Sequence, residues 1–388
     1  MYTIQTRNSI SPKGLERLPS SLFCIEEEDV QSPQGILVRS ANMLEDSFDS
    51  SLLAIARAGA GTNNIPVERC SEKGIVVFNT PGANANAVKE LVLGALVLSG
   101  RDVASAISWC SSIKGEGEAV PKLVEKGKSK FAGPELAGKT LGVVGLGAIG
   151  VKVANAACHL GMEVLGYDPF ISVDVAWTLE RSVKHCVNFG DLLQNCDFIT
   201  LHLPVNADTR GIVNAAAIAQ MKPSACILNF ARGELVDTPA ALAALKSGRL
   251  GRYITDFPTA ELIDQPGVVC IPHLGASTPE SEDNCAVMAA DQMKDYLLNG
   301  NITNSVNLPC VHAPRTTGSR ICALHRNTKG VLAALTGQLG AVNINISNLS
   351  NKSRGDYAYT LLDVDTAPDE DIVQKMSDLE GIIRLRVL

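Results

Sequence analysis

The sequence lacks the features that would tie the chain to a membrane or to nucleic acid. Its 388 residues contain no uninterrupted apolar stretch of the roughly 20 residues that span a bilayer, and the N-terminal segment MYTIQTRNSISPKGLERL has no apolar signal core. The formal net charge is -7, and no cluster of Lys and Arg interrupts it, so a phosphate backbone would be repelled. We therefore expect a cytoplasmic protein with no nucleic-acid or membrane partner.

Cysteine is not scarce, but its spacing excludes the frameworks that cysteine often builds. The 11 cysteines include no CxxC pair, and such pairs are typical of zinc sites and of thioredoxin-like redox sites. Cys158, Cys226, Cys270 and Cys322 lie in apolar helix or strand patterns. The cysteines are thus predicted to be reduced packing residues, and no metal site is expected.

Alternating β-rich runs and helical patterns predict an α/β protein with more than one domain. From about residue 140 the β-rich runs are TLGVVGLG, MEVLGYD, CDFITLHLP, ACILNFARG, GRYITDFP and VVCIPHLG. Strands that alternate with helices predict a Rossmann-type doubly wound parallel sheet, which we assign to residues 96–279. A weaker alternation predicts a smaller flavodoxin-like α/β substrate domain over residues 1–95, completed by residues 280–305.

The C-terminal region has a pattern of its own. Residues 306–317 include Pro309 and Pro314 and lack periodicity, so they are predicted to be a linker. Residues 318–388 then give strand, helix, two strands, helix and strand. This order predicts a ferredoxin-like βαββαβ domain.

A glycine-rich turn follows the first strand of the larger domain. Gly145, Gly147 and Gly150 form a GxGxxG motif between an apolar run and a helical pattern. In that context the glycines permit a tight turn, backbone contact with a pyrophosphate and close helix packing. Asp168 ends the second strand, where a carboxylate accepts hydrogen bonds from a ribose. Because no arginine follows it to accommodate an extra phosphate, NAD rather than NADP is the expected cofactor.

Three polar side chains follow predicted strands at the edge where open α/β sheets bind ligands. Oxidation of a hydroxy acid needs a base, a cation for the carboxylate and a group that orients the base. We assign these roles to His273, Arg232 and Glu261, with Glu261 accepting a hydrogen bond from the His273 ring. His202 is the rival base; it is predicted to line the cofactor pocket, and a purely structural role stays open.

The motifs GLGAIG, GYDP, LHLP, NFARGELVD and PHLGAST resemble the D-isomer-specific 2-hydroxyacid dehydrogenases, and the similarity runs from about residue 36 to residue 305. The resemblance implies the catalytic roles given above for the arginine, the glutamate and the histidine. It also implies cofactor contacts, which fall on Ala148 and Ile149 at the pyrophosphate and on Phe230, Ala231, Asp256 and Gly275 at the nicotinamide.

Two departures from the family pattern bear on this assignment. Many relatives carry Arg or His where Ala148 stands, so pyrophosphate binding is expected to depend on backbone and helix dipole. The usual segment DVFPTE reads DFPTAE here. Alignment on Asp256 keeps the acid at Glu261, whereas the other alignment puts Ala260 in its place and breaks the relay.

The last seventy residues resemble ACT regulatory domains through HRNTKGVL, VNINI and SRGDYAYTLLDVD. The resemblance implies that His325, Asn327 and Asn345 contact an amino acid such as L-serine, across a pair of domains in a homodimer or homotetramer. Lys329 stands where many relatives have proline, which weakens the expectation of an effector site. The alternative is a domain that only dimerises.

A dehydrogenase with such a tail resembles the branch of the family that oxidises 3-phospho-D-glycerate to 3-phosphohydroxypyruvate with NAD, at the start of L-serine synthesis. Arg39 and Arg57 fall on positions that resemble substrate-binding arginines of that branch, although either is also compatible with a surface charge. A reductase of glyoxylate or hydroxypyruvate would keep every catalytic motif. An NAD-sensing binding protein is the alternative of another class, and the intact Arg, Glu and His set disfavours it.

Overall fold

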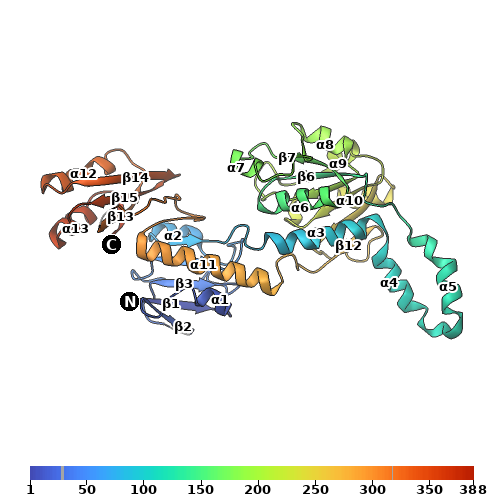
Figure 1. Ribbon diagram of the computed structural model, residues 1–388, viewed down its shortest axis with the longest axis horizontal. Coiled ribbons are helices and arrows are strands. Elements are labelled where there is room, and N and C mark those ends of the chain that lie inside the picture. Colours follow the sequence, from blue (N-terminus) through green and yellow to red (C-terminus); the bar gives the residue numbers. More distant parts are fainter. Residues whose placement is uncertain (28–29, 317) are drawn as a thin grey trace. The chain divides into compact units, whose positions relative to one another are not determined.

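The computed structural model describes residues 1–27, 30–316 and 318–388. The chain forms two compact units, one made of Met1–Asn84 with Pro279–Leu388 and the other of Ala85–Thr278. Figure 1 shows the helices and strands of both units.

The unit Ala85–Thr278 is built around a seven-stranded parallel sheet with the order β12-β11-β10-β9-β6-β7-β8. The strands are β6 (Thr140–Val144), β7 (Glu163–Tyr167), β8 (Lys184–His185), β9 (Phe198–Leu201), β10 (Ala225–Asn229), β11 (Leu250–Thr255) and β12 (Val268–Cys270). Strands β9 and β10 are buried along their whole length, as expected for a parallel sheet with both faces covered. The predicted Rossmann-type sheet is confirmed, with β8 as an edge strand that the sequence pattern did not indicate.

The helices that cover this sheet are α3 (Ala85–Gly100), α6 (Ala148–His159), α7 (Val173–Ala176), α8 (Phe189–Asn195), α9 (Ala215–Gln220) and α10 (Thr238–Lys246), and the 3-10 turn η3 (Gly233–Leu235) follows β10. Helices α4 (Val103–Ser112) and α5 (Val120–Gly127) project from the unit and pack against the 3-10 turns η1 (Lys114–Ala119) and η2 (Lys128–Phe131) (Figure 1). No single described helix is long and apolar enough to cross a membrane. Only α3 and α4 together reach that length and composition, and they are bent by 70° at their junction.

The other unit begins with a five-stranded parallel sheet of order β2-β1-β3-β4-β5, which is the flavodoxin-like order. Its elements are β1 (Tyr2–Arg7), α1 (Pro12–Leu15), β2 (Phe23–Glu26), β3 (Gly35–Val38), β4 (Ala54–Arg57), α2 (Val67–Glu72) and β5 (Val76–Phe78). The long helix α11 (Pro279–Asn299) returns to this sheet, and its Ala289, Ala290 and Met293 join the core that β1, β3, β4 and β5 form.

The same unit ends in a four-stranded antiparallel sheet of order β14-β15-β13-β16. Its elements are β13 (Ser319–Arg326), α12 (Val331–Ala341), β14 (Ile346–Arg354), β15 (Tyr357–Val364), α13 (Glu370–Ser377) and β16 (Ile382–Val387). This βαββαβ order confirms the predicted ferredoxin-like domain. The second strand begins at Ile346, because α12 extends to Ala341 and Asn343 adopts a left-handed conformation (φ 58°).

The segment between α11 and β13 is packed. Ile302 pairs with Val311, and both side chains are fully buried in the core of the five-stranded sheet together with Leu308. Residue 317, the last of the predicted linker, lies outside the described residues. The described part of this segment therefore joins the C-terminal domain to the five-stranded sheet through buried contacts.

A buried ion pair stabilises the junction between the C-terminal sheet and the segment that follows α11. The guanidinium of Arg320, at the start of β13, donates to both carboxylate oxygens of Asp363 on β15 at 2.6 and 3.0 Å, and both side chains are at most 1% exposed. Arg320 also donates to the carbonyls of Asn299, Ala313 and Pro314. One side chain thus joins the C-terminal sheet, the end of α11 and the segment that follows it.

Candidate active site

The glycine-rich turn has the geometry that its sequence predicts. Gly145 adopts φ 92°, and a Cβ on it would lie 2.6 Å from the carbonyl oxygen of His202. A Cβ on Gly150 would lie 1.9 Å from the carbonyl oxygen of Gly145, so this position also requires glycine. A Cβ on Gly147 would meet nothing within 4 Å. The backbone at Gly147 is therefore open to a ligand.

The residues at this turn fit a dinucleotide. Within the described chain no side chain caps the first turn of α6, so its N–H groups are available to an anion. Ala148 is exposed and Ile149 half-buried in that turn. Because Ala148 offers no positive charge, backbone donors and the helix dipole must carry the attraction for a pyrophosphate.

Asp168 lies directly beside the glycine-rich turn. Its Oδ2 accepts a 2.8 Å hydrogen bond from the backbone N–H of Leu146, and its Oδ1 accepts a 2.9 Å bond from that of Phe170. The carboxylate therefore holds the turn while remaining half-exposed. Each oxygen keeps further lone pairs, which is the requirement for binding ribose hydroxyls.

The predicted chemical residues follow β10, β11 and β12, which are neighbours in the sheet. Arg232 follows β10 and His273 follows β12, and both side chains are exposed. Asp256 follows β11 and is 1% exposed. The fold thus places the predicted base and the predicted carboxylate-binding cation at the same edge, on either side of a buried acid.

Asp256 is in an unusual electrostatic state. Burial raises the pKa of Asp256, although the positive charges of His273 and Arg232 and the backbone N–H of Gly275 oppose this shift. Among the described residues, its buried Oδ1 has no hydrogen-bond partner. A buried carboxyl group with unused bonding capacity next to a guanidinium and an imidazole is typical of functional sites. Phe230 and Gly275 are buried and Ala231 is half-buried around it.

Glu261 and His273 are not joined in this structure. Within the described residues no hydrogen bond or ion pair links the two side chains, and both are exposed. The ring of His273 packs instead on Phe257, with 4.9 Å between ring centroids. The orienting role of Glu261 therefore stays a prediction, and Ala260, the residue of the alternative alignment, is exposed on the same turn.

His202, unlike the exposed His273, has a ring nitrogen that is buried in the protein. Burial lowers the pKa of His202 to about 3. Its Nε2 lies 3.0 Å from the Thr200 hydroxyl, and its buried Nδ1 has no partner among the described residues. Its backbone N–H donates to Val144 and its carbonyl lies against Gly145. This position beside the glycine turn favours the predicted place in the cofactor pocket.

Arg39 and Arg57 lie side by side in the other unit, just after β3 and at the end of β4. The Nε of Arg57 donates to the carbonyl of Arg39 at 3.0 Å, and its Nη1 donates to the carbonyl of Gly61. Arg39 pairs with Glu282 of α11 at 2.5 Å, with both side chains 42% exposed. Arg57 is therefore held by backbone, whereas Arg39 has a surface pairing that a ligand can displace.

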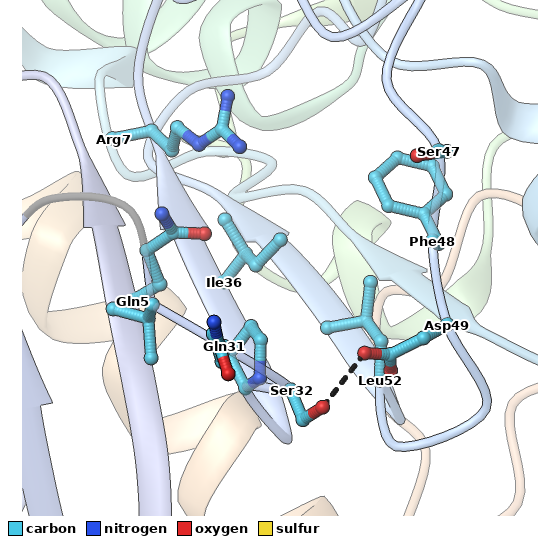
Figure 2. Close-up of a pocket in the computed structure, with 11 residues that line it drawn as sticks. Gln5, Arg7, Gln31, Ser32, Ile36, Ser47, Phe48, Asp49 and Leu52 are labelled. Atoms are coloured by element: carbon cyan, nitrogen blue, oxygen red, sulfur yellow. Dashed lines mark hydrogen bonds between the residues drawn. The ribbon is translucent and has the colours of Figure 1, made fainter.

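The unit that contains these arginines also has a pocket of about 260 Å³ (Figure 2). Figure 2 shows Arg7 and Gln5 of β1 facing the loop that carries Asp49, whose carboxylate accepts a 2.9 Å hydrogen bond from Ser32. Hydrogen bonds from Ser51 and Ser32 lower the pKa of Asp49. Neither Arg39 nor Arg57 is among the described residues that line this pocket, so it is separate from the predicted substrate arginines.

The three predicted effector residues lie at two ends of one sheet. His325 and Asn327 lie where β13 meets Tyr357, the first residue of β15, whereas Asn345 precedes Ile346, which pairs with Val364 at the other end of β15. At about 3.3 Å per residue, the two ends are roughly 23 Å apart. A single ligand can contact all three residues only across two copies of the domain.

The groups at these positions also differ in their availability. The His325 ring is buried, with Nδ1 2.8 Å from the carbonyl of Arg326 and Nε2 2.9 Å from the Thr360 hydroxyl. Asn327 is exposed and donates to the carbonyl of Gly355, while Asn345 is exposed at the start of β14. Asn327 and Asn345 are thus the more accessible contacts.

Sequence reasoning missed a residue that the structure places beside Arg232. Asn229 ends β10, is fully buried and bonds to the turn that carries the arginine. A signal was present in the motif NFARG, because an asparagine side chain readily accepts a hydrogen bond from the backbone two residues later.

Comparisons with known proteins agree with this geometry. The family model described as D-isomer specific 2-hydroxyacid dehydrogenase, NAD binding domain, matches residues 104–275. A D-3-phosphoglycerate dehydrogenase of Haemophilus influenzae is 32% identical over 364 residues, which cover 90% of this chain and 84% of that protein. One of Methanocaldococcus jannaschii is 36% identical over 291 residues, 73% of this chain but only 53% of that relative.

A solved structure agrees as well. The NAD+-bound 3-phosphoglycerate dehydrogenase of Entamoeba histolytica is 26% identical, with a TM-score of 0.58 over 79% of this chain and 98% of that one. The chain therefore belongs to the D-isomer specific 2-hydroxyacid dehydrogenases, with the D-3-phosphoglycerate dehydrogenases among its relatives.

Proposed function

We propose that the chain is an NAD-dependent D-3-phosphoglycerate dehydrogenase, which oxidises 3-phospho-D-glycerate to 3-phosphohydroxypyruvate at the start of L-serine synthesis. The observation that carries this proposal is the extent of the match to the Haemophilus influenzae enzyme. It spans 90% of this chain and therefore reaches beyond the dehydrogenase domains into the C-terminal region.

The residues at the edge of the seven-stranded sheet supply the chemistry. The guanidinium of Arg232 binds the substrate carboxylate, because its planar N–H donors match the two oxygens of a carboxylate. The Nε2 or Nδ1 of His273 takes the proton from the C2 hydroxyl as that carbon loses its hydride. NAD, when bound, accepts the hydride; Gly145, Gly147, the N-terminus of α6 and Asp168 are the groups that hold it.

The phosphate group is assigned to the arginines of the other unit. Arg39 and Arg57 are adjacent, and a dianion gains more from a nearby guanidinium than an unphosphorylated hydroxy acid does. Neutralising Arg39 should therefore raise KM more for 3-phosphoglycerate than for an unphosphorylated 2-hydroxy acid. An equal loss for both substrates would mean that Arg39 binds the shared carboxylate or supports the fold.

The test of the main proposal is a substrate panel. The purified chain is mixed with NAD or NADP and with 3-phosphoglycerate, glycolate, glycerate, lactate or malate, and absorbance of the reduced cofactor is followed. The expected result is the highest kcat/KM with NAD and 3-phosphoglycerate. Higher kcat/KM with glycerate or glycolate would favour a glyoxylate or hydroxypyruvate reductase, and cofactor binding without turnover would favour a sensor.

For the C-terminal domain, we propose an L-serine effector site in a cytoplasmic homodimer or homotetramer. The separation of Asn345 from His325 and Asn327 supports it, because one ligand then needs groups from two copies. Serine should inhibit the intact enzyme, and Asn345→Ala should remove inhibition without changing uninhibited kcat. An enzyme indifferent to millimolar serine would leave the domain an assembly module.

A further inference from the structure

We propose that Asn229 is the positioning residue that sets the place and direction of Arg232, and this inference rests on the carboxylate-binding role proposed for that arginine. Asn229 is the last residue of β10 and is fully buried. Its Nδ2 donates to the carbonyl of Arg232 at 2.8 Å, and its Oδ1 accepts from the N–H of Ala231 at 3.2 Å. One amide therefore closes the turn from the strand to the arginine.

The turn depends on this amide for its shape. Arg232 itself has an extended backbone (φ -153°, ψ 138°), and its guanidinium Nη1 donates to the carbonyl of Ala231 at 2.7 Å. The backbone that Asn229 holds is thus the same backbone that the guanidinium contacts. A change in the conformation of residues 231 and 232 would move the guanidinium, which is exposed and makes no other hydrogen bond to the described residues.

A second contact ties the turn to the neighbouring strand. The Nδ2 of Asn229 lies 3.5 Å from the hydroxyl of Tyr253 on β11, and Tyr253 is 1% exposed. Burial raises the pKa of Tyr253, so its hydroxyl stays neutral at physiological pH. Because β11 leads to Asp256, Asn229 and Tyr253 connect the two strand ends that present Arg232 and the buried acid.

The side-chain amide of Asn229 both donates and accepts a hydrogen bond, so two variants can separate these contacts. Asn229→Asp keeps an acceptor for Ala231 but loses the donor to Arg232, whereas Asn229→Ala loses both. Asn155 is a matched control in the same unit, because its amide also donates to a carbonyl, that of Thr178, and accepts from a backbone N–H, that of Glu180, each at 2.8 Å. Asn155 has no contact with the turn at Arg232.

The experiment separates positioning from folding by its readouts. A misplacement of about 1 Å costs on the order of 10²-fold in catalysis. We therefore expect Asn229→Ala and Asn229→Asp to raise KM for the hydroxy acid about 10- to 100-fold, and by a larger factor than they raise the dissociation constant of NAD. Asn155→Ala should lower the melting temperature without raising that KM.

A double-mutant cycle gives the decisive comparison. If Asn229 acts through Arg232, Asn229→Ala should cost little further kcat/KM once Arg232→Ala is present, because the two residues then belong to one unit of function. Losses that multiply, or an unchanged KM in both Asn229 variants, would overturn the proposal.

The outcome is independent of the substrate's identity. If the wild type prefers another 2-hydroxy acid, the proposed function fails but the comparison is made on that acid, which shares the carboxylate. If it oxidises none, calorimetric binding of oxalate in the presence of NADH replaces KM. Asn229→Ala should weaken oxalate binding as Arg232→Ala does, and oxalate binding at wild-type strength would overturn the proposal.

Discussion

Two aspartates with the same 1% exposure lie in different units and in opposite electrostatic states. In the unit with the seven-stranded sheet, burial raises the pKa of Asp256, and its Oδ1 has no described partner. In the other unit, Asp363 accepts hydrogen bonds from Arg320 and Thr316. Burial raises its pKa, but these bonds and the charge of Arg320 hold the pKa of Asp363 below its usual value.

The difference separates two uses of buried charge. A carboxylate that is fully hydrogen-bonded, as at Asp363, joins segments of the chain. Breaking its ion pair costs several kcal/mol of folding free energy. A carboxyl left with bonding capacity, as at Asp256, costs stability and is retained where a ligand or a proton needs it. The comparison predicts that variants near Asp256 change activity and that variants near Asp363 change stability.

The largest effect is expected at His273. It interacts with Asp256 and is the proposed base, so His273→Ala should lower kcat by about 10²–10⁴-fold. NAD affinity and melting temperature should change little, because the ring is exposed. Kinetics and NAD titration measure this split.

His202→Ala is the matched comparison. With a pKa of about 3, His202 is neutral at the pH of the assay and is a poor proton acceptor. Its loss should weaken NAD binding more than turnover. If His202→Ala instead abolished turnover with NAD affinity intact, the base would be His202.

Asp363→Asn should give the largest loss of stability. Removing one partner of a buried ion pair typically costs about 3–5 kcal/mol, since Arg320 would keep its charge without a counter-ion. Chemical denaturation measures this loss, and kcat/KM of the folded variant should stay close to that of the wild type.

The pH dependence of the free energy of unfolding follows from the same pair, Arg320 and Asp363. Because the folded pKa of Asp363 is depressed, its stabilisation is present above the unfolded value of about 3.9 and is lost as pH falls through the folded pKa. Wild type should therefore lose stability below about pH 4 more steeply than Asp363→Asn. Parallel curves would mean that the pair contributes nothing net.

The third effect concerns Asp168, a half-exposed carboxylate whose oxygens can accept further hydrogen bonds. Hydrogen bonds to a charged group contribute about 1.5–3 kcal/mol, so Asp168→Ala should raise KM for NAD roughly 10- to 100-fold and should relieve the repulsion of NADP. Asp168→Asn keeps an acceptor for Leu146 and is the control for the shape of the turn. Equal kcat/KM of the wild type with both cofactors would contradict the assignment.

The sequence predicted the parts of this molecule that depend on backbone pattern. The parallel doubly wound sheet, the glycine turn and the βαββαβ tail follow from periodicity and from glycine geometry, and the structure confirms these elements. The pattern could not predict that the Oδ1 of Asp256 has no hydrogen-bond partner among the described residues or that Arg320 joins three segments. Those properties depend on which side chains meet across residues distant in sequence.

Side-chain contacts between distant residues also decide the case of Glu261, whose predicted hydrogen bond to His273 is not present in the described part of the structure. The sequence argument placed it by counting residues from Asp256, but its contact with His273 depends on the path of an exposed turn. Asn229 is the opposite case: sequence reasoning missed it, although its contacts with Ala231 and Arg232 lie within three residues and a local rule for asparagine turns would have been sufficient to find it.

The smallest expected effect is a gain in stability in Asp256→Asn. Since the folded pKa of Asp256 is raised, the folded state binds the proton more tightly than the unfolded state, and stability falls as pH rises from about 4 through the folded pKa. The asparagine cannot ionise, so this loss should be absent and the variant should be more stable than the wild type at neutral pH. Its kcat/KM should nevertheless fall, because the charge beside His273 and Arg232 is gone. Denaturation at pH 4 and pH 7 together with kinetics measures both changes. A variant less stable than the wild type at pH 7 would place Asp256 with Asp363 as a structural acid.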